Sequence, residues 1–102
     1  MVQPPHMLQE SLSIAAIRLD TIQGRILESL YQRSERWREP TELAREVFPG
    51  AAAYRDGELR GFLQPRLRRM AALGIVKLNR LGAAISLKGI ELMENRSRPS
   101  LT

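Results

Sequence analysis

Arginine dominates the residues of this chain that could take part in chemistry. The 102 residues hold 16 Lys and Arg against 11 Asp and Glu, a net charge of +5. Residues 55–80 hold seven basic and two acidic side chains, net +5, whereas residues 1–54 are net −1 and residues 81–102 are net +1. A charge run is commonly a solvated face, but arginines clustered on one element are also typical of a protein that binds a polyanion. The segment 55–80 is therefore the first candidate for a binding site.

Other kinds of site find little support. The chain has no cysteine, so disulfides, thiolate nucleophiles and cysteine-ligated metals are excluded. Its one histidine, His6, lies beside Pro4 and Pro5, and metal sites and nucleophilic triads draw heavily on histidine. Glu39 and Glu42 stand where a helix is expected to begin, where carboxylates complement the helix dipole. With no nucleotide-binding motif either, we expect no enzyme, no cofactor and no metal.

Length and composition favour one small helical domain. The chain is 43% hydrophobic and 5% aromatic, which indicates a core of Leu, Ile, Val and Ala. No run approaches the ~20 apolar residues that span a bilayer, and residues 1–10 lack a basic segment followed by an apolar one. We therefore expect a cytoplasmic protein without membrane contact.

The N-terminal third carries the strongest periodic pattern. Its apolar residues recur in steps of three and four, as on one helical face: Leu8, Leu12, Ala15, Leu19, Ile22, Ile26 and Leu30. Asp20 and Thr21 favour a helix boundary, so we predict two helices with a break near residue 20. The stripe from Ile22 is assigned to the core. The part up to Leu19 is assigned equally to core or to pairing with a second subunit, so residues 1–18 are an arm or helix that could form a homodimer.

A polar connection, a helix and an ambiguous stretch follow. Gln32 to Arg38 reads as a connection, with Trp37 packed on the first core helix. Pro40 suits the first position of a new helix that turns Leu43, Ala44 and Val47 inward and ends at Phe48-Pro49-Gly50. From Ala51 to Phe62 no assignment is made, because the alanines favour a helix and Gly57 and Gly61 oppose a long one.

The last third predicts a helix, a hairpin and a final helix. A short helix begins at Leu63 with Pro65 in its first turn and ends at Leu73-Gly74. Ile75 to Arg80 alternates as a strand, with Val76 and Leu78 on its buried side, and a second arm carries Ile85 and Leu87. Ile90, Leu92 and Met93 belong to a last short helix, and residues 95–102 form a flexible basic tail.

Four segments in this order resemble the winged helix-turn-helix domains of MarR-like and related small transcription regulators. They are Ile22–Leu30 (IQGRILESL), Pro40–Ala44 (PTELA), Leu63–Val76 (LQPRLRRMAALGIV) and Ile85–Leu92 (ISLKGIEL). The resemblance covers residues 19–94 and implies a mainly α fold with a small β-hairpin, a three-helix core plus a two-stranded wing. It also implies a transcriptional regulator that binds double-stranded DNA in a sequence-specific way. The link from Phe48 to Leu63 is longer than an ordinary helix-turn-helix turn, and the wing at Asn79 to Ala83 is short.

The candidate DNA contacts follow from the predicted helix at residues 63–73. If Leu63, Leu67 and Met70 face the core, a 100° step per residue turns four residues outward and leaves two on the flanks. The outward residues are Pro65, Arg68, Arg69 and Ala72, and the flanking ones are Gln64 and Arg66. In the major groove Arg can bind guanine and Gln can bind adenine. The resemblance places Lys77 and Arg80 on the wing, and Arg55 and Arg60 would add contacts to the DNA backbone.

Two other readings remain open. The chain could be a winged-helix module that docks on a larger protein assembly without binding DNA, in which case an apolar patch should occupy the place of Arg68 and Arg69. It could also bind RNA, which differs mainly in the polyanion preferred.

Overall fold

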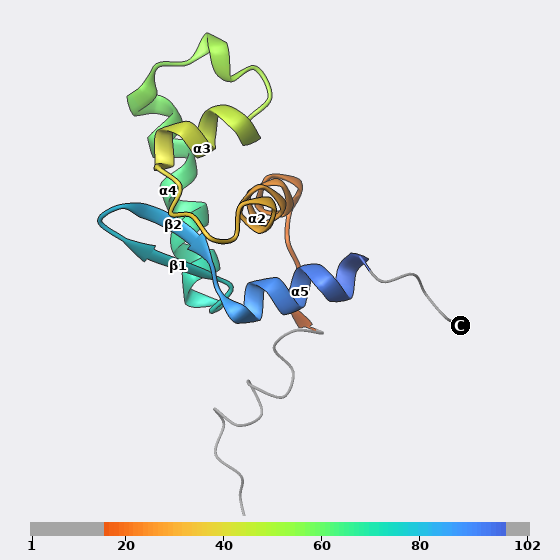
Figure 1. Ribbon diagram of the computed structural model, residues 1–102. Coiled ribbons are helices and arrows are strands. Elements are labelled where there is room, and N and C mark those ends of the chain that lie inside the picture. The colour runs from red at the N-terminus through yellow and green to blue at the C-terminus, as the bar shows by residue number, and fades with distance from the viewer. Residues whose placement is uncertain (1–15, 98–102) are drawn as a thin grey trace, which may run out of the picture.

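The structure is a computed structural model that describes residues 16–97. Its elements are α2 (Thr21–Gln32), α3 (Pro40–Val47), the 3-10 turn η1 (Ala51–Ala53), α4 (Asp56–Ala72), β1 (Val76–Asn79), β2 (Gly82–Ile85) and α5 (Leu87–Ser97) (Figure 1). The described part is thus mainly helical with one two-stranded antiparallel hairpin, as expected. Leu8 to Ala15 and residues 98–102 lie outside the described residues, so the predicted arm and the end of the tail are not tested.

The predicted break near residue 20 is confirmed. Asp20 caps α2, since its carboxylate accepts a hydrogen bond from the Gln23 N–H at 2.7 Å. The Gln23 side chain accepts one from the Asp20 N–H at 3.0 Å. This reciprocal pair satisfies two of the helix-end donors and fixes where α2 begins. The helix then buries Ile26, Leu27 and Leu30 completely.

Helix α3 begins and ends where the sequence predicts. Pro40 is in its first turn, and the carboxylate of Glu39 accepts a hydrogen bond from the Glu42 N–H at 3.0 Å. That bond lowers the pKa of Glu39 below its ordinary range, because it favours the ionised carboxylate. The helix ends at Val47, and Phe48 is its C-cap. Its inward face is the predicted one: Leu43, Ala44 and Val47 are buried.

Helix α4 is longer than predicted. It begins at Asp56, seven residues before Leu63, so Pro65 lies inside the helix and not in its first turn. Two interactions outweigh the helix-breaking tendency of its glycines: Glu58 accepts a hydrogen bond from the Arg55 N–H at 2.9 Å, and Leu59 is completely buried. Its predicted end is confirmed, with Leu73 as the C-cap and Gly74 at φ +81°.

The hairpin differs from its predicted form in two respects. Leu78 is 43% exposed, although the alternation of the strand predicts it on the buried side. Leu87 is the first residue of α5, 85% exposed, and not part of β2. All four residues of β2 are buried because the strand lies between β1 and residue 38: Arg38 pairs with Ala83 through two backbone hydrogen bonds of 2.7 and 2.9 Å. The segment before α3 is therefore joined to β2 by an isolated antiparallel bridge at Arg38.

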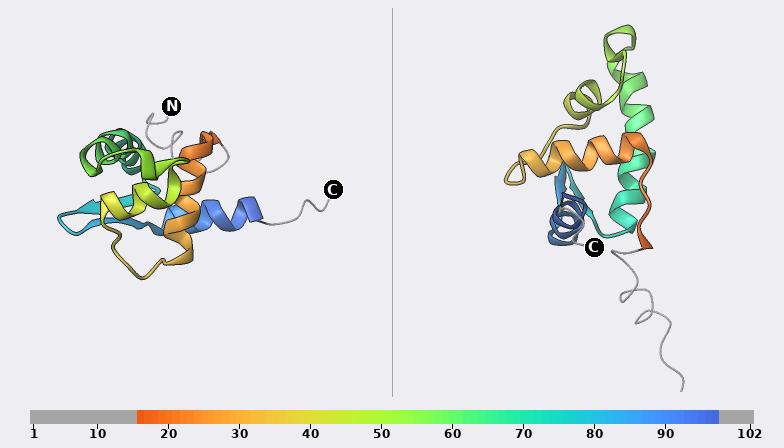
Figure 2. Two further views of the ribbon diagram at one scale, coloured as in Figure 1. Left: turned by 90° about the horizontal axis from the view of Figure 1, so that it is seen from above. Right: turned by 90° about the vertical axis from the view of Figure 1, so that its right-hand side faces the viewer.

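The helices and the hairpin enclose one cluster of buried side chains. Helix α4 packs against α3 and β1, and α2 packs against α3, α5 and β2. Figure 2 shows α5 extending from the hairpin beside α2, with Leu92 in the core. The final helix continues to Ser97, so residues 95–97, predicted as part of a flexible tail, are helical.

Candidate nucleic-acid interface

The exposed face of α4 has the composition that the helical spacing predicts. Leu63, Leu67 and Met70 are buried, with 3% exposure or less. All four predicted outward residues are exposed: Pro65, Arg68, Arg69 and Ala72. The two predicted flanking residues, Gln64 and Arg66, are half-buried. The prediction of which side chains face solvent is confirmed. Their role as DNA contacts remains a prediction.

Arg68 and Arg69 carry the free positive charge of this face. Within residues 16–97, neither guanidinium makes a hydrogen bond, an ion pair or a contact with an aromatic ring. A guanidinium without an intramolecular partner keeps its five donors available for an anion. The two side chains lie on the two sides of the exposed face, because successive residues are 100° apart on a helix.

Arg66 is engaged within the domain. Its guanidinium lies over the ring of Phe48, 5.5 Å from the ring centroid, and its Nη1 donates to the Phe62 carbonyl at 2.9 Å. The Phe62 ring also packs edge-on against Phe48 and Tyr54, with centroids 5.9 and 5.2 Å apart. Arg66 therefore joins an aromatic cluster at the α3–α4 link, a role that the sequence analysis missed.

The charged side chains in the first turns of α4 mostly pair with other residues of the domain. Arg60 donates to the Thr41 hydroxyl at 2.8 Å and lies 3.5 Å from the Glu39 carboxylate, so it fastens α4 to the start of α3. Asp56 pairs with Arg45 of α3. Arg55 is exposed immediately before the helix. The unpaired arginines of α4 itself are thus in its C-terminal half.

The hairpin contributes one free arginine and one partly engaged lysine. Arg80 is exposed in the turn between the strands, and no described residue pairs with its guanidinium. Lys77 places its ammonium 5.6 Å from the centroid of Trp37. Trp37, which the sequence predicts to pack on the first core helix, is 38% exposed and has the ammonium group of Lys77 over its ring.

Helix α4 and the hairpin approach each other closely enough to share a surface. A depression that is lined by both apolar and polar residues lies between them. Its lining residues are Pro40, Gln64, Leu67, Arg68, Leu78, Asn79 and Gly82. The structure therefore brings the predicted residues Gln64 and Arg68 together with the hairpin. Arg69 is exposed beside Arg68 on the same helix but does not line the depression, and Arg55 and Arg60 lie toward the other end of α4.

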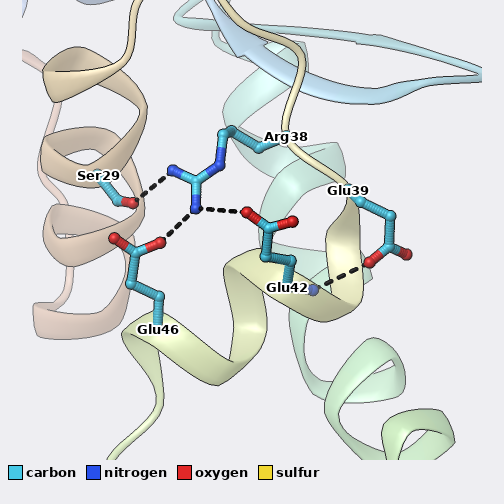
Figure 3. Close-up of polar contacts among 5 residues, drawn as sticks. All are labelled: Ser29, Arg38, Glu39, Glu42 and Glu46. Atoms are coloured by element: carbon cyan, nitrogen blue, oxygen red, sulfur yellow. Dashed lines mark hydrogen bonds and ion pairs between the residues drawn. The ribbon is translucent and has the colours of Figure 1, made fainter.

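A polar cluster that the sequence pattern did not predict surrounds the buried Arg38 side chain. Arg38 is only 3% exposed, and its guanidinium donates to the Ser29 hydroxyl at 3.1 Å, to the Glu42 carboxylate at 3.3 Å and to the Glu46 carboxylate (Figure 3). The hydrogen bond from Arg38 lowers the pKa of Glu46 below its ordinary range, although burial acts in the other direction. Because both carboxylates bind Arg38, the cluster is an anchor between α2, α3 and the segment before α3.

The described residues contain no group of three or more His, Asp or Glu side chains placed to hold a metal ion. None of the helices between residues 16 and 97 combines the length and apolar character that crossing a membrane requires. Comparison of the chain with protein-family models, with curated proteins and with solved structures finds no match.

Proposed function

We propose that this chain is a winged helix-turn-helix protein that binds double-stranded DNA and regulates transcription in the cytoplasm. Helix α4 enters the major groove, and the hairpin is the wing beside it. The observation that carries the proposal is the pair Arg68 and Arg69, which are exposed and have no partner between residues 16 and 97, on a helix whose opposite face is the core. Their positive charge stays available for phosphates and base edges.

The arrangement predicts how strongly binding depends on salt. Three guanidinium groups on this surface have no partner among the described residues, namely Arg68, Arg69 and Arg80, and Lys77 can add a fourth charge. The slope of log K against log salt concentration is about −0.9 for each phosphate neutralised. A bound chain should therefore show a slope of at most about −2.7 for three charges at phosphates or −3.6 for four, and an arginine that binds a base edge instead makes the slope shallower.

Base preference comes from the residues that can reach base edges. Arg68 and Arg69 can each bind guanine through O6 and N7, and Gln64 can bind adenine. Loss of one such guanine contact costs about 1–3 kcal/mol and relaxes the preference at that position. Contacts from Arg80 and Lys77 to phosphates add affinity without sequence information.

A binding titration tests the proposal. Duplexes that the chain retains are first selected from a random library, and the affinity for a selected duplex is measured by fluorescence anisotropy at several salt concentrations. The double variant Arg68→Ala/Arg69→Ala should bind at least about 30-fold more weakly at low salt, because two guanine contacts are lost. It should also lose the selected preference.

A matched control separates this surface from net charge. Arg33→Ala/Arg36→Ala removes the same charge from exposed residues in the connection between α2 and α3, and Figure 2 shows that connection on the side of the domain away from α4. This control should bind nearly as the unchanged chain does. Equal losses in both double variants would mean that general charge, not α4, determines binding. No retained duplex at low salt would refute the proposal.

A protein-docking module is the second candidate. The positions of Arg68 and Arg69 are basic rather than apolar, but Phe62 and Tyr54 are 39% and 41% exposed near the start of α4. If docking is the function, Phe62→Ala should weaken capture of the partner while Arg68→Ala/Arg69→Ala leaves it unchanged. The expected homodimer is tested separately by light scattering, with and without residues 1–15.

A further inference from the structure

Arg38 is a buried charged residue that takes no part in the proposed DNA contacts. Its side chain joins α2 through Ser29 and α3 through Glu42 and Glu46. Its backbone joins the hairpin, because the Arg38 N–H donates to the Ala83 carbonyl and the Ala83 N–H donates to the Arg38 carbonyl. One residue thus links the helical core to β2, the strand that leads out of the hairpin turn.

The backbone of residue 38 and the backbone of the hairpin are in close contact. A Cβ placed on Gly82 would lie 1.9 Å from the Arg38 carbonyl oxygen, so β2 can approach residue 38 only because position 82 is glycine. In Figure 3 the Arg38 guanidinium points into the space between α2 and α3, where Ser29, Glu42 and Glu46 converge on it. The backbone of residue 38 is therefore held from the helix side by the guanidinium and from the hairpin side by two hydrogen bonds.

We propose that Arg38 is a positioning residue of the DNA interface: it fixes the hairpin relative to α4 and so places Arg80 on the surface that Arg68 and Arg69 occupy. The inference rests on the proposed function. Removing the guanidinium should leave α4 intact and release the hairpin, so the contribution of Arg80 to binding is lost although Arg38 does not contact DNA.

Amide hydrogen exchange tests the positioning without DNA. Glu46→Gln removes one of the two carboxylates that bind Arg38 and keeps a similar shape, so it is the mild variant, and Arg38→Met is the severe one. The Ala83 N–H should exchange about tenfold faster in Glu46→Gln, which corresponds to the weaker end of the range for a hydrogen bond to a charged group. The Met70 N–H in α4 should change much less. Asp56→Asn is the matched control, because it breaks the Arg45 ion pair, which does not involve the hairpin.

A double-mutant cycle then tests the link to binding. Arg38→Met should lower the magnitude of the salt slope by about 0.9, the value for one phosphate, as Arg80→Ala does. Combining Arg38→Met with Arg80→Ala should cause no further loss, whereas combining it with Arg69→Ala should be additive. If Arg38→Met does not fold, Glu46→Gln replaces it in the cycle.

The outcomes are distinguishable. Equal acceleration of Ala83 and Met70 exchange would show that Arg38 only stabilises the whole domain, and additivity with Arg80→Ala would show that it does not act through the hairpin. Either result overturns the inference. Absence of DNA binding by the unchanged chain would refute the proposed function, while the exchange measurement would still decide whether Arg38 holds the hairpin.

Discussion

Replacing Gly82 by alanine should destabilise the domain far more than its one added methyl group suggests. Gly82 has a φ of +133°, a conformation that residues with a side chain rarely adopt. Its Cβ would lie 1.9 Å from the carbonyl oxygen of Arg38 and 2.7 Å from the carbonyl carbon. Both atoms belong to backbone, so the clash cannot be relieved by turning a side chain. Strand β2 must move away from residue 38.

The cost can be worked from these contacts. A backbone held in such a sparsely populated region costs of order 1–3 kcal/mol for a residue other than glycine. Moving β2 also breaks the two hydrogen bonds between Arg38 and Ala83, each worth about 1 kcal/mol. The sum is about 3–5 kcal/mol, a large share of the roughly 5–15 kcal/mol by which small domains are stable.

Urea denaturation followed by circular dichroism measures the free energy of unfolding of Gly82→Ala and of a matched control, Gly57→Ala. Gly57 lies in α4, and its added Cβ would meet nothing within 4 Å. The control should therefore stabilise the chain by about 0.5–1 kcal/mol, since alanine favours a helix. A Gly82→Ala variant within about 1 kcal/mol of the unchanged chain would show that the close approach of β2 to residue 38 does not determine stability.

Three further predictions concern the same core. Gly89→Ala should destabilise by about 1–3 kcal/mol in thermal unfolding, because its Cβ would lie 2.2 Å from the buried Ile75 carbonyl oxygen. Leu63→Ala should cost about 2–5 kcal/mol, since Leu63 is completely buried, and a loss under 1 kcal/mol would contradict its place in the core. Because the pKa of Glu46 is lowered in the folded chain, ionised Glu46 stabilises the fold above the ordinary carboxyl pKa, and this contribution is lost as the pH falls through the lowered value. The stability difference between the unchanged chain and Glu46→Gln should hence be larger at pH 7 than below about pH 4, and a difference independent of pH would refute it.

Helical spacing was sufficient to predict the faces of α4 but not its beginning. The recurrence of Leu63, Leu67 and Met70 determines which side is buried, and the exposed arginines follow from the same geometry. The N-terminal boundary depends on tertiary packing instead. Gly57 and Gly61 lower the helix propensity of the first turns, and the burial of Leu59 compensates for it, which propensity alone does not reveal.

The role of Arg38 in holding the hairpin could not be predicted from the sequence. Arginine is rarely buried, so a polar connection was the natural assignment for residues 32–38. Its burial requires partners from two helices, Ser29 in α2 and Glu46 in α3, together with the main chain of β2. The one local signal was the four-residue spacing of Arg38, Glu42 and Glu46, but α3 begins only at Pro40, so a helical pair between residues 38 and 42 was not expected.

The salt dependence of DNA binding separates what composition predicts from what the structure predicts. The segment 55–80 contains seven basic residues, and a count of charges alone would give a slope of about −6.3 for each bound chain. In the structure Arg60 pairs with α3 and Arg66 lies on Phe48, and Arg55 lies some 20 Å along α4 from Arg69 at a rise of about 1.5 Å per residue. The remaining charges give at most about −2.7 to −3.6. A measured slope near −6 per chain would mean that the internal pairs open on binding, and it would refute the division of the arginines into those that hold the fold together and those that face the DNA.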